Sequence, residues 1–599
     1  MIDNIDLSIR DKILYWSQAE VFDQSTRTEI QNLIDQDSVK ELNDRFYKDL
    51  EFGTGGMRGL VGAGSARLNV YNIRKASLAL VSYLKEQYTS TKQLIVAISY
   101  DSRIHSRHFA EYTAEVFAAY GVRTLITQEM RPVPMLSFMV RHFGCQAGVC
   151  ITASHNPPAY NGFKVYWGSG GQLVPPHDLG ILTQYKSIKR YEDIRTLSFA
   201  KGLEDGLIQE IGSELDNAYL KKITELSFRR EEASSRYQHE LSTFKIVYSA
   251  LHGTGGFAVP KALDAFGFKQ IYLEEEQAKP DGNFPTVKSP NPEDPSALER
   301  AVLLAKKINA DIVLATDPDA DRVGIVVREE DQWVSFNGNQ MGCLFYEYIF
   351  SSLKEKKRLP EYPLAVKTVV TTDLQKKIAE FYGAFCEETL TGFKWIGGLI
   401  EAYESGEKKP YKSFVCGGEE SYGFLTGTFV RDKDAVIACA MLCEMTAYYK
   451  SLGKTLSQVL DSLFLRHGVY EESLFTLELP GKNGAERIQG ILKNLRARPP
   501  RSIAGQTVLQ IKDYLLGKQK SGADLSLEDP LHFVKENMLQ FELPQARLSI
   551  RPSGTEPKVK VYTSVFSTDT VNIENLPVLK KQVKILLASL EKAIKELVF

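Results

Sequence analysis

Short apolar segments of strand length alternate with helical segments through most of this chain. In the first such region, strands are predicted at residues 94–99, 122–126 and 147–151, interleaved with helices at about 73–86 and 109–120. This alternation is typical of βαβ units, which build a mostly parallel sheet. The sequence therefore predicts an α/β fold, in which ligands bind beyond the carboxyl ends of the strands.

The same alternation returns further along the chain. Strands are predicted at residues 244–248, 270–273, 312–315 and 323–327, and again from residue 364 to 370. A chain of 599 residues is expected to form several domains, about four at the usual size. We place a helical extension at residues 1–50 and domains at 51–215, 216–330, 331–455 and 456–599.

Apolar stripes at helical spacing lie near both ends of the chain. The first stripe comprises Ile30, Leu33, Ile34, Leu42 and Phe46. The second comprises Leu579, Val583, Leu586, Leu590, Ile594 and Leu597. Stripes of this kind face a protein core, so both segments are predicted to pack against neighbouring elements.

Composition excludes several classes of partner. The formal net charge is −2, so no overall basic field favours nucleic acid or an anionic membrane. No apolar run approaches the roughly 18 residues of a membrane span, and the N-terminus lacks an apolar signal core. Seven cysteines in so long a chain are expected to be reduced thiols in the cytoplasm. Cys439 and Cys443 have the spacing of a metal pair on a helix, but two small buried residues are favoured.

Ser154 lies in a polar segment whose shape its neighbours restrict. The segment TASHNPPAYNGFK, residues 152–164, directly follows a predicted strand. Asn-Pro-Pro permits neither strand nor helix, so the chain must turn and hold Ser154 at the strand end. His155 and Lys164 can exchange protons beside it, and Lys164 can also neutralise a phosphate. The pattern predicts a nucleophilic serine; the alternative is a tight polar turn with a surface lysine.

Three aspartates alternate along the loop between the predicted strands at 312–315 and 323–327. They are Asp317, Asp319 and Asp321, and Arg322 follows them. Without a cation, three carboxylates aimed at one centre would repel one another. Hard oxygen ligands suit Mg²⁺, which keeps free positions for water or phosphate oxygen. An EF-hand is excluded because its glycine and distal glutamate are not at the required offsets, and a solvated acidic turn is the alternative.

Two glycine-containing segments carry donors suited to phosphate. Backbone N–H groups at residues 52–59 can curl around an anion, and Arg58 adds a fork of donors. The segment RPSGTEPK, residues 551–558, combines Arg551 and Lys558 with hydroxyl groups, and Gly554 allows N–H groups to converge. For the first segment, a glycine turn with an exposed arginine is the alternative.

Another loop carries acceptors suited to a sugar. The segment GGEESYG, residues 417–423, follows a predicted strand, and Glu419 and Ser421 suit vicinal hydroxyl groups. A helix-start turn is the alternative. Lys433, in the segment RDKD at residues 431–434, is either a further phosphate contact or part of a charged helix cap.

Together, the segments TASHNPPAYNGFK, DPDADR, GGEESYG and RPSGTEPK resemble those of the α-D-phosphohexomutases, the phosphoglucomutase and phosphomannomutase superfamily. The resemblance spans roughly residues 50–565 and is specific as a combination. It implies three similar α/β domains with mixed sheets and a smaller C-terminal α+β domain around a central cleft. The chain is most similar to the branch with bacterial phosphoglucomutases and phosphopentomutase-like enzymes. Pro318 and Ala320 stand where many relatives carry glycine, which is expected to stiffen the loop.

The resemblance also implies a role for each matching residue. Ser154 would carry the phosphoryl group, and Asp317, Asp319 and Asp321 would hold Mg²⁺ together with an oxygen of the phosphorylated Ser154. His155 and Lys164 would assist proton transfer, with Arg58 in the same catalytic group. The residues assigned to substrate binding are Arg322, Lys394, Glu419, Ser421, Lys433, Arg551, Ser553, Gly554 and Thr555.

The expected activity is interconversion of glucose 1-phosphate and glucose 6-phosphate through the phosphoserine and glucose 1,6-bisphosphate. Alternatives within the same chemistry are mannose phosphates, pentose phosphates and synthesis of glucose 1,6-bisphosphate. A non-catalytic sugar-phosphate-binding protein is a further alternative, but the presence of Ser154, Lys164 and all three aspartates argues against it. The expected partner is a small phosphosugar, with no nucleic acid or membrane, and the sequence predicts no particular oligomeric state.

Overall fold

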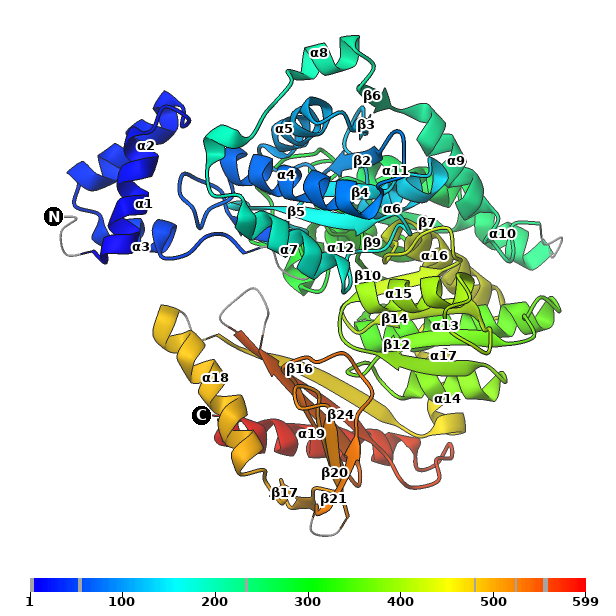
Figure 1. Cartoon of the computed structure of the whole chain (residues 1–599). Helices are drawn as coiled ribbons and strands as arrows, with labels where there is room; N and C mark the ends of the chain where they lie inside the picture. Colours follow the sequence, from blue (N-terminus) through cyan, green and yellow to red (C-terminus); the bar gives the residue numbers. More distant parts are fainter. Residues whose placement is uncertain are drawn as a thin grey trace. The chain divides into compact units, whose positions relative to one another are not determined.

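The computed structural model describes residues 5–51, 56–231, 235–478, 481–522, 525–552 and 558–598 (Figure 1). The chain divides into two compact units. Unit 1 comprises Met1–Phe336, Ile396–Pro410 and Ser421–Tyr448. Unit 2 comprises Asn337–Trp395, Tyr411–Glu420 and Tyr449–Phe599.

Three short helices form the N-terminal arm of unit 1: α1 (Leu7–Gln18), α2 (Gln24–Asp35) and α3 (Val39–Phe46). Asp6 and Asp23 begin the first two helices by accepting hydrogen bonds from backbone N–H groups of the first turn. The arm buries an aromatic cluster, in which Trp16 stacks on Phe22 with ring centroids 4.3 Å apart. The predicted packing role of this arm is therefore confirmed.

The first sheet of unit 1 has the strand order β1-β5-β4-β2-β3-β6. Strands β2, β3, β4 and β6 are parallel, whereas β5 runs antiparallel to β4 and to β1. The carboxyl ends of β2 and β4 therefore lie at one edge. The bounds are β1 (Gly56–Leu60), β2 (Ile95–Tyr100), β3 (Arg123–Thr127), β4 (Ala147–Ile151), β5 (Tyr160–Trp167) and β6 (Ile208–Ile211).

Helices cover this sheet and bury its apolar residues. Helix α5 packs on β2, β3 and β4, and α6 packs on β2 and β4. All five residues of β4 are buried, as expected for a central strand of a covered sheet. The helices of this region are α4 (Val70–Gln87), α5 (Ser106–Ala119), α6 (Val133–His142), α7 (His177–Ser187), the 3₁₀ helix η2 (Tyr191–Asp193), α8 (Phe199–Glu204), α9 (Ser213–Thr224) and α10 (Ser235–Thr243).

The second sheet of unit 1 repeats the arrangement of the first, with the order β11-β10-β9-β7-β8. Strands β7, β8 and β9 are parallel, and β10 returns antiparallel to β9, as β5 does to β4. Loops β4–β5 and β9–β10 thus occupy equivalent positions. The elements are β7 (Lys245–Ser249), α11 (Gly255–Ala265), β8 (Gln270–Leu273), α12 (Pro295–Ile308), β9 (Ile312–Thr316), β10 (Val323–Glu329) and β11 (Gln332–Ser335).

Three later elements contribute to unit 1 wholly or in part: α15 (Phe393–Glu404), β15 (Gly423–Thr426) and α16 (Ala435–Ser451). Both Cys439 and Cys443 lie on α16, are fully buried and have no disulfide partner. The interpretation of this pair as small core residues is therefore confirmed.

Unit 2 contains a third parallel arrangement, in which β12 lies between β13 and β14. Its central strand is flanked in the same way as β2 and β7. The elements are α13 (Gly338–Glu355), β12 (Pro363–Thr368), α14 (Leu374–Phe381), β13 (Phe385–Thr389), β14 (Ser413–Glu419) and α17 (Leu456–His467).

The C-terminal part of unit 2 is built differently, around an antiparallel sheet with the order β16-β24-β23-β22-β19-β20-β21. Helix α19 packs on β16 and β24. The elements are β16 (Tyr470–Glu478), α18 (Gly481–Ala497), β17 (Ser502–Ile503), β18 (Gln506–Thr507), β19 (Gln510–Asp513), β20 (Lys518–Ser521), β21 (Leu527–Pro530), β22 (Leu539–Leu543), β23 (Ala546–Pro552), β24 (Lys558–Phe566) and α19 (Leu576–Val598).

The predicted stripe of the last helix is correct over most of its length and wrong at its end. Val583, Leu590 and Ile594 are buried on α19. Leu597 is 42% exposed, because the last turn directs Val598 to the core instead.

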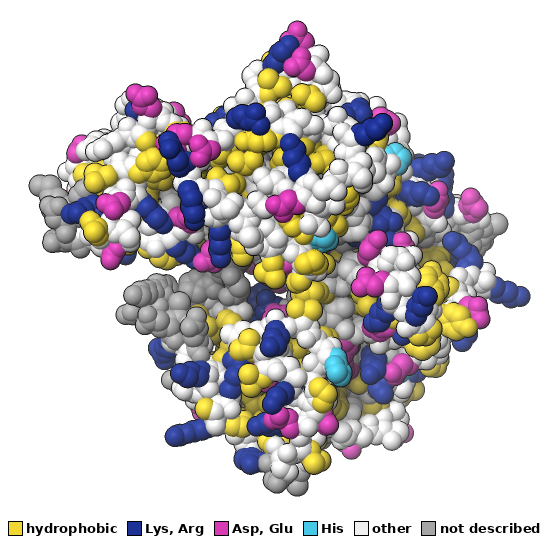
Figure 2. Space-filling model, viewed as in Figure 1, with side chains coloured by type: hydrophobic (Ala, Val, Ile, Leu, Met, Phe, Trp, Pro, Cys, Tyr) yellow, Lys and Arg dark blue, Asp and Glu magenta, His cyan; other side chains and the backbone are white. Residues whose placement is uncertain are grey.

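The surface and the helices agree with the charge and hydropathy of the sequence. Lysine and arginine side chains are interspersed with aspartate and glutamate over the visible face (Figure 2). Within the described part of the chain, no helix combines the length and apolar character needed to cross a membrane.

Candidate active site

Ser154 lies at the carboxyl end of β4, in the loop that returns to β5. Its backbone φ is +54°, a left-handed conformation that costs energy for a residue with a side chain. The Ser154 N–H donates to Thr152 Oγ1 at 2.8 Å, and the residue is only 3% exposed. The turn predicted from Asn-Pro-Pro is thus present, and it aims the hydroxyl inward.

Arg103, just after β2, holds this loop in place through hydrogen bonds to its backbone. Its guanidinium donates to the carbonyl oxygens of Ser154, Asn156, Pro157 and Tyr160. The Arg103 side chain is fully buried and lies 3.4 Å from the Asp101 carboxylate. Arg103 lies four residues beyond the strand predicted at 94–99, and the sequence analysis gave it no role.

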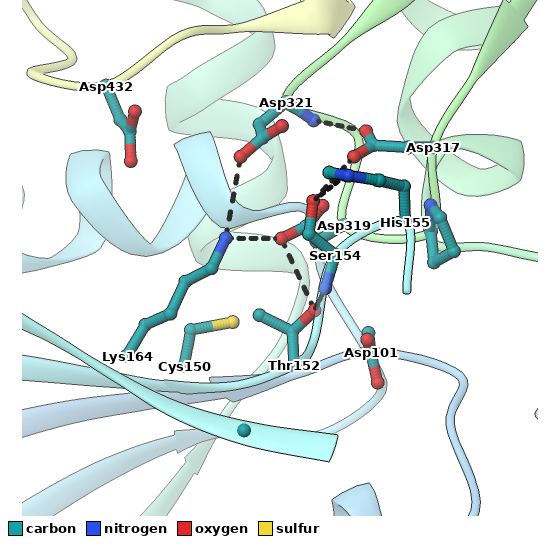
Figure 3. Close-up of polar contacts among 12 residues, drawn as sticks. Asp101, Cys150, Thr152, Ser154, His155, Lys164, Asp317, Asp319, Asp321 and Asp432 are labelled. Atoms are coloured by element: carbon teal, nitrogen blue, oxygen red, sulfur yellow. Dashed lines mark hydrogen bonds and ion pairs between the residues drawn. The ribbon is translucent and has the colours of Figure 1, made fainter. Parts of the chain in front are cut away.

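The three aspartates of the β9–β10 loop converge on one point (Figure 3). One carboxylate oxygen from each of Asp317, Asp319 and Asp321 lies within 4.8 Å of the others, and all three residues are buried. Oδ1 of Asp319 and Oδ1 of Asp321 have no hydrogen-bond partner among the described residues. Buried acceptors without donors are costly, so this donor set fits a hard divalent cation.

The loop that carries the aspartates is tightly shaped. Ala320 adopts a φ of +51°, in the left-handed region that favours glycine. The Pro318 carbonyl accepts from the Thr254 N–H at 2.8 Å, and the Asp317 carboxylate accepts from the N–H groups of Asp321 and Arg322. These bonds hold the alternating carboxylates on one side of the loop.

The serine loop and the aspartate loop meet directly (Figure 3). Ser154 Oγ donates to Asp317 Oδ2 at 2.9 Å and lies 3.2 Å from His155 Nδ1. Lys164, on β5, places Nζ 2.7 Å from Asp319 Oδ2 and 3.5 Å from Asp321 Oδ2. Residues from two different sheets thus form one polar cluster.

Charge within the cluster is only partly balanced. Burial, with Asp321 and Asp319 close by, raises the pKa of Asp317 well above its ordinary value. Burial would also raise the pKa of Asp321, but Lys433, Lys164 and Arg322 together hold it below its ordinary value. Ionising all three buried carboxylates at once costs free energy unless further positive charge is present.

Lys433 also reaches the cluster. Its Nζ lies 3.0 Å from Asp321 Oδ2 and 3.3 Å from Asp432 Oδ1. The other oxygen of Asp432 accepts from Tyr166 Oη and Gln172 Nε2, each at 2.7 Å. Tyr166 and Gln172 carry no sequence motif, and only the fold reveals them.

Three further predicted residues of unit 1 lie around this cluster. Arg58 donates to Asn156 Oδ1 at 3.0 Å, and Arg322 pairs with Glu293. Ser421 precedes Tyr422, whose carbonyl accepts from the Val323 N–H at 3.0 Å, at the end of the aspartate loop. The structure therefore brings the predicted residues of unit 1 together.

The predicted residues of unit 2 form a second group. Glu419 Oε1 accepts from the Gly392 N–H at 2.9 Å, which joins the GGEESYG segment to the segment carrying Lys394. Lys394 Nζ lies 4.6 Å from the centre of the Trp395 ring. Arg551, at the end of β23, lies 3.4 Å from Glu536. Ser553, Gly554 and Thr555 lie outside the described residues, as do residues 52–55 of the first glycine segment.

A buried serine beside a carboxylate cluster that fits a metal ion, on repeated α/β sheets, defines a class of phosphoryl-transfer proteins. The chain matches domains I, II and III of the phosphoglucomutase/phosphomannomutase family, each described as alpha/beta/alpha, over residues 49–192, 217–330 and 337–467.

Full-length relatives agree with these domain matches. The chain is 34% identical over 550 residues to a phosphoglucomutase of Staphylococcus aureus strain MSSA476, covering 90% of this chain and 93% of that one. It is 33% identical over 548 residues to a phosphoglucomutase of Staphylococcus saprophyticus, covering 91% and 95%. The chain belongs to the phosphoglucomutase/phosphomannomutase family, within the α-D-phosphohexomutase superfamily.

A solved structure shares the fold. The crystal structure of parafusin from Paramecium, described as a phosphoglucomutase in an open form, aligns with a TM-score of 0.65 at 18% identity. The alignment covers 91% of this chain and 95% of that one. The expected fold class, with α/β domains and a β-rich C-terminal region, is confirmed.

Proposed function

We propose that this chain is a phosphosugar mutase that interconverts glucose 1-phosphate and glucose 6-phosphate, with Ser154 as the carrier of the phosphoryl group. The observation that carries the proposal is the 2.9 Å hydrogen bond from Ser154 Oγ to Asp317 inside the aspartate cluster. The names of the Staphylococcus relatives support phosphoglucomutase activity and favour glucose over mannose or pentose phosphates.

We assign Asp317, Asp319 and Asp321 as ligands of Mg²⁺, together with an oxygen of the phosphorylated Ser154. Their buried oxygens, two of them without donors among the described residues, support this choice. A bound Mg²⁺ would act as a Lewis acid that neutralises charge on the phosphoryl oxygens.

The chain's own residues would position and exchange the proton of Ser154. When Ser154 Oγ attacks phosphorus, the bond between phosphorus and the sugar oxygen breaks and the serine loses its proton. His155 Nδ1, 3.2 Å from Oγ, is placed to accept that proton when the ring is neutral. Against the effect of burial, Asp319 and Asp321 raise the pKa of Lys164, so the Lys164 ammonium stays protonated and holds a proton for the departing sugar oxygen.

The cycle needs a bisphosphorylated intermediate. Phosphorylated Ser154 transfers its group to the free hydroxyl of a sugar monophosphate, and glucose 1,6-bisphosphate forms. After the intermediate turns round, its other phosphoryl group returns to Ser154. We assign the non-reacting phosphate to Arg551, Ser553, Gly554 and Thr555, and the sugar hydroxyls to Glu419 and Ser421. Arg58, Arg322, Lys394 and Lys433 are proposed as additional phosphate or sugar contacts.

Seven cysteines without disulfide partners support a reducing compartment, and we propose the cytoplasm. The small phosphosugar is the partner that this function requires.

Two measurements test the function. Incubation with glucose 1,6-bisphosphate should add one phosphoryl group to the intact protein, and peptide analysis should locate it on Ser154. A coupled assay should then rank glucose, mannose and ribose 1-phosphates, with glucose 1-phosphate first. A protein that acquires no phosphoryl group and turns over none of the three sugars would contradict the proposal.

A further inference from the structure

We infer that Arg103 is a positioning residue for Ser154: it holds the serine loop through main-chain oxygens and thereby sets the direction of the nucleophile. This inference rests on the proposed function, because it concerns how well Ser154 is aligned for phosphoryl transfer. The Arg103 side chain is fully buried and contacts the serine loop through main-chain oxygens alone among its described hydrogen bonds.

The hydrogen bonds of Arg103 enclose the whole turn. Nη2 donates to the Ser154 carbonyl at 2.6 Å and also to the Asn156 carbonyl. Nη1 donates to the carbonyls of Pro157 and Tyr160, each at 2.9 Å. Only a planar fork of donors can serve four oxygens arranged in this way, and a lysine ammonium cannot reach all of them.

The guanidinium is itself fixed in place. Asp101 lies 3.4 Å from Arg103 Nε, and the Asp101 carboxylate accepts from Ser106 Oγ at 2.7 Å and from the Arg103 N–H at 2.9 Å. On the other side, the guanidinium lies 5.0 Å from the centre of the Phe284 ring. These contacts hold the Arg103 side chain in one position, unlike a mobile side chain on the surface.

The backbone conformation of Ser154 explains why the serine loop needs a residue that holds it in place. A serine at φ +54° is in an unfavourable conformation and will relax unless surrounding contacts fix it. Relaxation would swing Oγ away from Asp317, its hydrogen-bond acceptor at 2.9 Å. A displacement of about 1 Å at a reacting atom can cost roughly a hundredfold in rate.

The first test is Arg103→Lys, with Arg107→Lys as the matched control. Arg107 lies on α5, four residues after Arg103, and also donates to backbone carbonyls, those of Thr127 and Gln128. None of its described hydrogen bonds goes to the serine loop. We expect Arg103→Lys to lower kcat at least about tenfold while KM for glucose 1-phosphate changes less than about threefold. Arg107→Lys should leave both constants near their wild-type values.

Two further readouts separate positioning from general stability. Hydrogen exchange should accelerate at the amides of Ser154, Asn156 and Tyr160, which donate hydrogen bonds within the turn, in Arg103→Lys but not in Arg107→Lys. In Arg103→Ala, free guanidinium ion at concentrations below those that unfold the protein should restore part of kcat, whereas sodium chloride at equal ionic strength should not. If Arg103→Ala does not fold, the kcat, KM and exchange measurements on Arg103→Lys still decide the question.

The outcomes distinguish this inference from the proposed function. If the wild-type protein takes up no phosphoryl group from glucose 1,6-bisphosphate, the proposed function fails. If the wild-type protein is an active mutase but Arg103→Lys keeps its kcat within about twofold, with unchanged exchange in the loop, Arg103 does not position Ser154. A fall in kcat matched by an equal fall in the control variant would also overturn the inference.

Discussion

At the scale of single residues, Ser154 offers the most direct test. Ser154→Ala removes the proposed carrier, so turnover should fall at least about a thousandfold. The melting temperature should change little, because the side chain lies in a loop and its backbone contacts remain. The measurements are the coupled mutase assay and thermal unfolding. Turnover within about tenfold of wild type would contradict the assignment of Ser154 as the nucleophile.

Asp319 tests the proposed metal site. Asp319→Asn replaces a charged oxygen, which hard cations prefer, so the Mg²⁺ concentration for half-maximal activity should rise at least about tenfold. Asp311→Asn is a suitable control, because Asp311 is buried directly before β9 but pairs with Arg328 at 3.1 Å. The measurement is activity against Mg²⁺ concentration, supported by the increase in melting temperature that Mg²⁺ gives. Unchanged Mg²⁺ dependence in Asp319→Asn would mean that these carboxylates are not ligands.

The residues that could be predicted share a local signal. Ser154 and the three aspartates stand out because polar groups cluster in turns directly after apolar strands. Arg103 gives no such signal, because its partners are carbonyl oxygens some fifty residues away in the chain. Tyr166 and Gln172 were missed for the same reason: they act on Asp432, more than 250 residues further on.

At the scale of elements, the alternation of strand and helix predicted most of the strands of the first two sheets. It did not by itself predict that β5 and β10 run antiparallel, since hydropathy carries no direction. Mixed sheets were expected only from the family resemblance.

Helix α16 provides a prediction about pH. Asp434, at its start, is fully buried, and burial raises its pKa to about 7, although hydrogen bonds from Tyr219 and the Ile437 N–H oppose the shift. The folded protein then binds this proton more tightly than the unfolded chain does. The contribution of Asp434 to stability should therefore be greatest below its unfolded pKa, near 4, and should be lost as the pH rises toward 7.

Asp434→Asn should remove this contribution while keeping an acceptor for the Ile437 N–H. The free energy of unfolding should then fall less between pH 5 and pH 8 in the variant than in the wild type, by an amount on the order of a few kcal/mol. Denaturant titrations at the two pH values measure this difference. If the wild type and Asp434→Asn lose equal free energy of unfolding between the two pH values, Asp434 is ionised in the folded protein at little cost.

At the scale of the whole molecule, Arg551 tests whether the C-terminal sheet takes part in the reaction. Loss of a charge-assisted contact to phosphate costs about 2 kcal/mol, so Arg551→Ala should raise KM at least about tenfold. The variant should also bind the bisphosphate intermediate less tightly while it reorients, so more free glucose 1,6-bisphosphate should be released per turnover. Phosphorylation of Ser154 should persist, since the proposed role of Arg551 is to hold the other phosphate.

The control for this variant is Lys518→Ala, because Lys518 lies in the same sheet and pairs only with the exposed Glu528 among the contacts described. KM and the bisphosphate released from the phosphorylated protein are measured for both variants. If Arg551→Ala matches Lys518→Ala in both quantities, the C-terminal domain has no part in holding the substrate.

The organisation of the chain was predictable in outline. The length of the chain and its alternation of strands and helices indicated several α/β domains. The family resemblance added the distinct C-terminal domain. The boundaries at residues 50, 215, 330 and 455 stay predictions, as do the roles of Ser553, Gly554 and Thr555. Hydropathy does not mark where one α/β region ends, because the last helix of one region resembles the first helix of the next.

The repeated strand order suggests how such a protein arose. Strands β2, β7 and β12 are each flanked by two parallel neighbours. The serine and the aspartates lie in the loops after β4 and β9, and Glu419 is the last residue of β14. If the proposed function holds, copies of one ancestral module diverged until each kept one part of the reaction: the phosphoryl carrier, the cation site and the sugar contacts. A module that carries out only one part of the reaction has no activity alone, so selection must preserve all three modules in one polypeptide.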